Sequence, residues 1–153
     1  MKRHPALHNL SHDHHQGLIL AQQLKKGAPQ YKGMPSTPED KKQYTISFYN
    51  SDLVKHFSDE EKILFPAVRS VNNELDKLIE EIISEHRKME VLVEKLEKTN
   101  QLENVMDELG NILELHIRKE ERKLFPTIQE IFSEEELDKI GDRLSITRQN
   151  TIN

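Results

Sequence analysis

Cysteine is absent from the 153 residues of the chain, which excludes disulfide bonds, catalysis by a thiolate and any zinc or iron–sulfur site held by cysteine. Tryptophan is also absent, and glycine occurs only five times. No apolar run approaches the roughly 20 residues of a membrane-spanning helix. The first residues contain no apolar stretch of the length found in a signal peptide. We therefore expect a cytoplasmic protein that does not bind membranes.

Charged residues make up 32% of the chain and hydrophobic residues 35%, so the apolar side chains must be concentrated on one face of each element. This composition favours amphipathic helices and an all-α protein. The formal net charge is −5 and no basic stripe offsets it, which argues against binding to nucleic acid. The length corresponds to a single domain, residues 1–153, with room for a substantial core.

Hydrophobic residues recur at spacings of three and four in four long segments, which predicts helices at about residues 5–27, 37–67, 73–96 and 100–131. Glycine and proline make up five of the twelve residues 27–38, which predicts an irregular connection there. A capping signal at Ser133 predicts a short fifth helix over residues 133–144, followed by a frayed tail at 145–153. We expect an antiparallel up-down four-helix bundle, with its core at about 5–132 and a short extra C-terminal helix.

One stretch occurs twice, sixty positions apart: His56 to Pro66 returns as His116 to Pro126. Six of the eleven positions are identical, namely the His, both Glu and the closing Leu-Phe-Pro. Residues four apart share a helix face, so each His lies beside the first Glu of its motif. In helical bundles, such pairs form halves of metal sites. A single pair is typical of a solvated helix, but two pairs with the same continuation indicate a metal site.

The other two long helices also carry histidines on their apolar faces. His86 lies fourteen residues from the turns at Asn72 and at Asn100, and His56 and His116 lie sixteen residues from those turns. The difference is about 3 Å along a helix, so an antiparallel bundle places all three at one level. In the first helix, His14 lies on the apolar stripe and His15 follows directly, whereas His8 and His12 are expected to be exposed.

The predicted cluster therefore contains four histidines with Glu60 and Glu120, and Glu90 is a further candidate because it follows His86 by four residues. Imidazole and carboxylate ligands suit iron, manganese or zinc, whereas calcium and magnesium prefer oxygen ligands. Two ions are favoured over one, because Glu60 and Glu120 can each bridge two cations about 3.5–4 Å apart. A single structural zinc would use four ligands and leave the others buried without a partner.

Neighbouring residues of the two motifs have predicted roles of a different kind. A rotation of 100° per residue takes Glu61 and Glu121 off the face of the histidines, so they are expected beside the site or exposed. The apolar residues that follow are expected to form a wall around the site; they are Leu64, Phe65, Leu124 and Phe125.

The order of one His, then His-x-x-x-Glu-Glu, then one His, then a second His-x-x-x-Glu-Glu resembles the hemerythrin-like family of HHE cation-binding domains, over about residues 7–131. The resemblance implies a four-helix bundle with a non-haem centre of two iron ions that is oxo- or carboxylate-bridged. It implies ligand roles for His56, Glu60, His86, His116 and Glu120. His15, with apolar residues three and four later, matches the usual family pattern, so both His14 and His15 remain candidates.

One departure from the family pattern bears on function. Oxygen-carrying hemerythrins resemble this sequence but have a histidine where this chain has Glu90, so reversible carriage of O2 is not expected. We interpret the chain as a di-iron protein that binds or senses O2, NO or iron. The alternatives are an enzyme with peroxidase, catalase-like or oxidase activity at the same centre, and a module for iron storage or delivery. The oligomeric state stays open.

Overall fold

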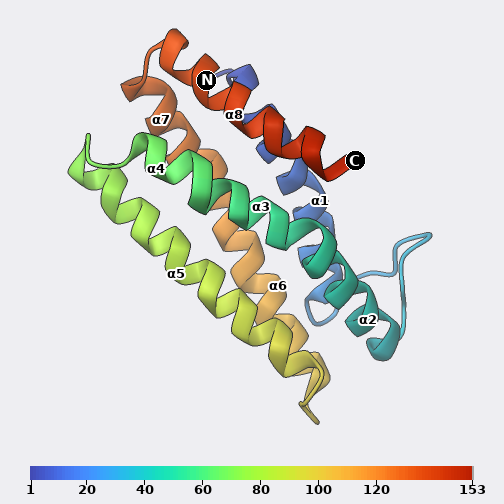
Figure 1. Cartoon of the computed structure of the whole chain (residues 1–153). Coiled ribbons are helices and arrows are strands. Elements are labelled where there is room, and N and C mark those ends of the chain that lie inside the picture. The colour runs from blue at the N-terminus through green and yellow to red at the C-terminus, as the bar shows by residue number, and fades with distance from the viewer. Residues whose placement is uncertain (153) are drawn as a thin grey trace.

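The computed structural model describes residues 1–152, and these residues contain helices and no strand, as predicted (Figure 1). Consecutive helical segments join end to end into longer helical columns. The first column consists of the 3₁₀-helix η1 (Pro5–Leu7) and α1 (His8–Leu24). The second consists of α2 (Pro38–Phe48), η2 (Tyr49–Leu53), α3 (Val54–Asp59), η3 (Glu60–Leu64) and α4 (Phe65–Val68). The third is α5 (Asn73–Leu96), and the fourth consists of α6 (Leu102–Lys119), η4 (Glu120–Leu124) and α7 (Phe125–Ile131). A fifth column, α8 (Glu134–Ile152), follows.

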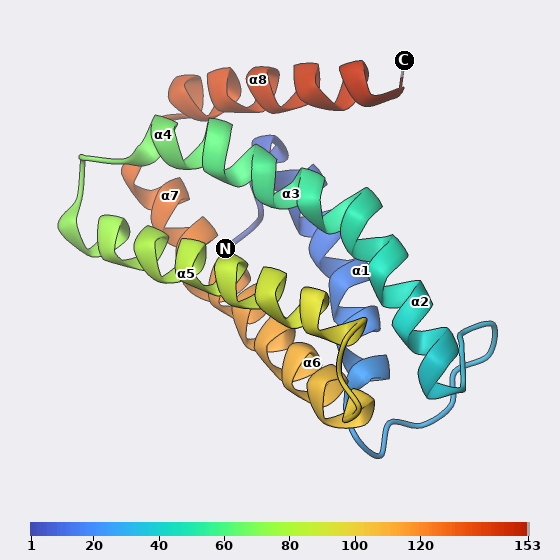
Figure 2. The same cartoon turned by 60° about the horizontal axis from the view of Figure 1, so that its bottom comes forward.

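The first four columns correspond to the four predicted helices. Helix α6 packs most extensively against α1 and α5. Figure 2 shows α8 beginning near α4 and α7 and running back beside α3, and it contacts η1 and η3. The side chains of Thr37 and Asn72 cap α2 and α5 as their positions in the sequence suggest. Asn100 does not act as a cap, because α6 begins at Leu102 after Gln101.

The prediction for the last segment is wrong. Instead of a short helix over residues 133–144 and a frayed tail at 145–153, α8 continues to Ile152, and only Asn153 lies outside the described residues. Polar contacts fix the added turns: Thr147 Oγ1 donates to Asp59 Oδ1 at 3.0 Å, and Arg148 Nε donates to Asp59 Oδ2 at 3.1 Å. Hydrophobic periodicity does not detect this kind of attachment.

Three π-helical turns interrupt the second and fourth columns, and two of them begin at the repeated glutamates, Glu60 and Glu120. The N–H groups of Phe65 and Phe125 bond to the carbonyls of Glu60 and Glu120, five residues earlier. The proline that follows each phenylalanine lacks an N–H and crowds the carbonyl four residues before it, so a wider turn relieves the backbone there. As a result, both the leucine and the phenylalanine of each Leu-Phe-Pro are fully buried.

The core consists of two apolar clusters. One lies toward α8 and includes Leu10, Phe65, Ile82 and Phe125. The other lies toward the α5–α6 turn and includes Leu20, Met89 and Leu113. Between these two sets of positions along the chain, the buried residues are histidines and glutamates. The fold therefore places a polar layer in the middle of its core.

Close packing of α1 against α6 depends on Gly110. A Cβ atom at this position would lie 2.8 Å from the carbonyl oxygen of Ala21 and 3.0 Å from Cβ of Leu24. Alanine favours a helix over glycine by about 1 kcal/mol, but here the two backbones must separate. We expect Gly110→Ala to lower the free energy of unfolding by about 1–3 kcal/mol. Urea unfolding checks this, with Asn111→Ala on the exposed side of α6 as the control. A gain in stability for Gly110→Ala would contradict the packing argument.

Candidate metal centre

Four histidines and two glutamates meet in the polar layer. Ligand atoms of one group lie within 4.8 Å of one another, and this group consists of His14, His56, Glu60 and Glu120. A second group meets the same condition and consists of Glu60, His86, His116 and Glu120. Each of the six residues is at most 3% exposed. The two groups share both carboxylates, so the residues form one continuous cluster with two potential ion positions.

Two sequence candidates lie outside this cluster. His15 is exposed because it lies one residue, or about 100°, around α1 from the buried His14. Glu90 is partly exposed, and Arg87 Nη1 donates to its carboxylate at 3.2 Å. The core-facing position one turn after His86 belongs to Met89, which is fully buried. Of the two candidates on the first helix, the structure therefore brings His14 into the cluster.

Several polar atoms of the cluster have no hydrogen-bond partner among the described residues. They are both carboxylate oxygens of Glu60 and of Glu120, and Nε2 of His86 and of His116. The ring nitrogens are the nearest groups of opposite character, at 2.7 Å between His14 Nε2 and Glu120 Oε2 and at 3.2 Å between His86 Nε2 and Glu60 Oε1. Burial of unpaired carboxylates is unfavourable by several kcal/mol. The nitrogen and oxygen donors fit a transition-metal cation that would pair them.

A carboxylate holds Nδ1 of every histidine in the cluster. The pairs are His14 with Glu121 at 2.6 Å, His56 with Asp13 at 2.9 Å, His86 with Glu61 at 2.7 Å and His116 with Glu85 at 2.8 Å. An ionised carboxylate only accepts hydrogen bonds, so we assign the Nδ1 proton to each ring, which leaves the Nε2 lone pair for a cation. We call these four acids the backing carboxylates, because each orients one potential metal ligand.

The positions of the ring nitrogens also call for a proton or a metal ion between them. Nε2 of His14 lies 3.1 Å from Nε2 of His56, and two bare lone pairs at this distance repel each other. Burial lowers the pKa of His56, but the carboxylates of Glu60 and Asp13 outweigh burial and hold this pKa well above its usual value. Burial likewise opposes the effect of Glu60 and Glu61 on His86, whose pKa nevertheless rises to about 9. At neutral pH the cluster therefore holds protons where a metal ion does not replace them.

The backing carboxylates follow the sequence repeat. The second glutamate of each motif backs the cluster histidine of another helix, since Glu61 contacts His86 and Glu121 contacts His14. The other two backing carboxylates, Asp13 and Glu85, back the motif histidines and were missed by the sequence analysis. A signal was available, because each of these two acids directly precedes the cluster histidine of its own helix. The same signal would have favoured His14 over His15.

Aromatic rings enclose the cluster. Phe125 stacks on His14 with ring centroids 5.4 Å apart, and Phe65 stacks on His86 at 6.4 Å. Together with Leu64 and Leu124 these rings are fully buried and form the expected apolar wall. Phe57, which the sequence analysis did not single out, stacks on His86 at 3.9 Å with an interplanar angle of 19°. These rings keep bulk water away from the carboxylates.

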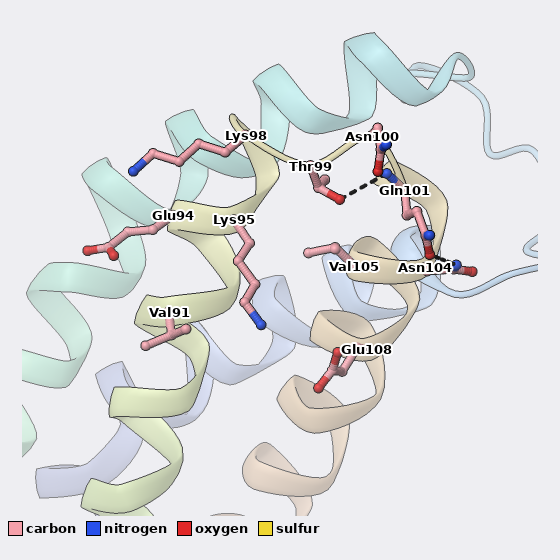
Figure 3. A pocket seen from close by; sticks show the side chains of 10 residues that line it. All are labelled: Val91, Glu94, Lys95, Lys98, Thr99, Asn100, Gln101, Asn104, Val105 and Glu108. Carbon is pink, nitrogen blue, oxygen red and sulfur yellow. Dashed lines mark hydrogen bonds between the residues drawn. The ribbon is translucent and has the colours of Figure 1, made fainter.

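Two surface grooves differ in their relation to the cluster. A groove of about 730 Å³ runs between α2–α3 and α5, and its wall includes Tyr49, Phe57 and the edge of His86. Glu61 and Arg87 form an ion pair there, over His86. A second groove, of about 580 Å³, lies at the α5–α6 turn and is lined mostly by charged and amide side chains, together with Val91, Thr99 and Val105 (Figure 3). Of these two grooves, the first borders the candidate centre, since His86 lines it.

The helical fold and the buried cluster define a helical domain whose core contains histidines and carboxylates suited to hold a metal cation. The family profile described as "Hemerythrin HHE cation binding domain" matches residues 5–128, and the chain belongs to this family.

Other comparisons add little to the family assignment. A protein of Nostoc sp. described as "DNA nickase" is 28% identical over 131 residues, which cover 83% of this chain and 34% of that protein. The chain thus spans about a third of the length of this relative. No solved structure matches the chain significantly. None of the described helices combines the length and the apolar character needed to cross a membrane.

Proposed function

We propose that the chain binds two iron ions in this cluster and uses them to bind or sense a small diatomic ligand, O2 or NO. The observation that carries the proposal is that two groups of ligand atoms share Glu60 and Glu120. The cluster offers four imidazole nitrogens and four carboxylate oxygens, which suffice for two ions with four protein ligands each. Iron sites with nitrogen and carboxylate ligands keep open positions for small ligands. Two shared carboxylates would also offset the repulsion between neighbouring cations.

When bound, iron supplies the affinity for O2 or NO and one-electron redox chemistry. The chain's own residues supply the rest. Glu60 and Glu120 compensate positive charge, and the backing carboxylates hold each imidazole with its Nε2 toward the centre. The rings of Phe57, Phe65 and Phe125 exclude water and admit small apolar molecules. Glu90 lies with Arg87 at the surface, so we propose no ligand role for it.

Metal analysis and spectroscopy test this proposal. We expect close to two iron ions per chain after anaerobic loading with Fe²⁺, and a stable change in the visible spectrum on addition of NO or O2. Saturation at one ion, or retention of zinc alone, would overturn the two-iron proposal.

Three further outcomes would redirect the proposed function. Sustained consumption of hydrogen peroxide would assign the alternative enzymatic role. Release of iron to a chelator on reduction, without an adduct, would assign storage or delivery. Nicking of supercoiled DNA by the loaded protein would indicate that the part shared with the Nostoc relative carries the activity in that protein's name.

A further inference from the structure

Each backing carboxylate is paired in turn with a cation. The pairs are Glu61 with Arg87, Glu85 with Lys119, Glu121 with Arg3 and Asp13 with Arg148. Arg87 and Lys119 belong to α5 and α6, the helices that carry His86 and His116. Arg3 precedes η1 and Arg148 belongs to α8, so the cations behind His14 and His56 come from outside the four long columns. The backing carboxylates of His14 and His56 thus pair with cations from outside the four long columns, whereas those of His86 and His116 pair with cations from within them.

The sequence repeat shows that the first motif lacks a cation that the second motif contains. Lys119 directly precedes Glu120 and pairs with Glu85, the backing carboxylate of His116. The corresponding residue of the first motif directly precedes Glu60 and is Asp59, an acid where the second motif has a base. Asp59 is only 4% exposed. The half of the cluster around His56 therefore lacks the local cation and contains an additional buried carboxylate.

Arg148 of α8 supplies the missing cation. Its Nε donates to Asp59 Oδ2 at 3.1 Å, and its Nη1 donates to Asp13 Oδ1 at 3.2 Å. Its Nη2 reaches the other oxygen of Asp13 at 2.5 Å, the oxygen that also accepts from His56 Nδ1. The planar guanidinium thus joins two carboxylates that would otherwise repel each other, and a lysine could not form the same fork.

Other contacts join α8 to the residues that carry Arg3. His4 Nε2 contacts Glu134 at 2.8 Å, and a Cβ atom on Gly141 would lie 3.0 Å from Cβ of Ala6. Residues 3–7 and α8 therefore form one packed unit against the half of the cluster that contains His14 and His56. The family profile ends at residue 128, before α8 begins.

We propose that Arg148 is a positioning residue for His56, and that α8 thereby controls the ion bound by His14 and His56 but not the ion bound by His86 and His116. This inference rests on the proposed binding of two ions. Because linkage is reciprocal, an ion at His56 also stabilises the docking of α8. A change in occupancy of one ion position would then be transmitted to the surface formed by α8.

Titration of the metal-free protein with Co²⁺ tests the inference in the full chain. The variants are Arg148→Met, Arg148→Lys and Lys119→Met, with Arg143→Met on the exposed side of α8 as the matched control. Binding is followed by the visible absorption of Co²⁺, and the ring N–H protons are followed by NMR of the loaded protein. Thermal unfolding reports whether each variant folds.

We expect Arg148→Met to weaken one of two binding steps about tenfold, the size found when residues supporting metal ligands are removed. Lys119→Met should weaken the other step, and the double variant should show both losses. In Arg148→Met, one histidine ring N–H signal, that of His56, should broaden by exchange with water. Arg148→Lys should retain part of the affinity, and Arg143→Met should match the wild type.

A rescue variant separates positioning from general packing. Asp59→Lys in the Arg148→Met background recreates the arrangement of Lys119 and Glu85, and should restore the weakened step and the sharp N–H signal.

The possible failures are distinguishable. If the wild type binds one Co²⁺ or none, the proposed two-ion function fails. If it binds two while Arg148→Met changes neither step, or weakens both equally together with unfolding, or is not restored by Asp59→Lys, the positioning role is overturned.

Discussion

Glutamine in place of Glu60 or Glu120 should reduce iron binding to at most one ion per chain and lower the affinity for that ion more than about 100-fold. This loss is larger than that expected for a residue that only supports a ligand. Each of these carboxylates belongs to both groups of ligand atoms and is fully buried. An amide carries no charge and cannot neutralise two cations. The measurement is iron content after gel filtration, together with the visible spectrum of the loaded protein.

The neighbouring glutamates provide the matched controls. Glu61 and Glu121 lie one residue along, but their carboxylates contact Nδ1 of His86 and His14 instead of entering the cluster. Glu61→Gln and Glu121→Gln should therefore keep two ions, with affinity lower by about tenfold because ring orientation is less well fixed. If the Glu60 or Glu120 variants bound two ions while the Glu61 and Glu121 variants bound fewer, the first glutamate of each motif would not be the metal ligand.

Much of this arrangement could be predicted because it depends on one-dimensional spacing. The apolar periodicity gave four helical columns, and the distances of His56, His86 and His116 from shared turns placed them at one level. The acid before His14 was a sequence signal that favoured it over His15, and the phase of α1 against its neighbours places His14 in the cluster. Glu90 lies outside the cluster for a similar reason, since a spacing of four allowed an inward position that packing gives to Met89.

Other features could not be read from periodicity. The π-helical turns at Glu60 and Glu120 change the helical phase within the motif itself, and they depend on the proline after each phenylalanine. The backing carboxylates act on a different helix from the one that carries them, so only the folded chain shows which histidine each contacts. Helix α8 buries an apolar stripe only as far as Leu144, and its later turns are attached through ion pairs of Arg148 with Asp13 and Asp59. Polar contacts between distant segments leave little periodic signal.

Removal of the metal should reverse the pH dependence of stability. In the metal-free protein the pKa of His86 rises from 6.5 to about 9, because contacts with Glu60 and Glu61 outweigh burial. A raised pKa contributes stability that is complete below pH 6.5 and is lost as the pH rises through 9. For His86 alone this loss amounts to roughly 3 kcal/mol. The pKa values of His14 and His56 are also raised, so their contributions change in the same direction.

The metal-loaded protein should behave in the opposite way over the same range. A metal ion must displace protons from His14, His56 and His86, so its affinity increases as the pH rises toward 9. At a free metal concentration of 100 times the dissociation constant, each ion adds about 2.7 kcal/mol. We therefore expect the melting temperature of chelator-treated protein to fall between pH 6.5 and pH 9, while that of Co²⁺-loaded protein holds or rises. Differential scanning calorimetry of both forms measures this. Parallel pH profiles for the two forms would mean that the ions do not occupy the sites where these histidines bind protons.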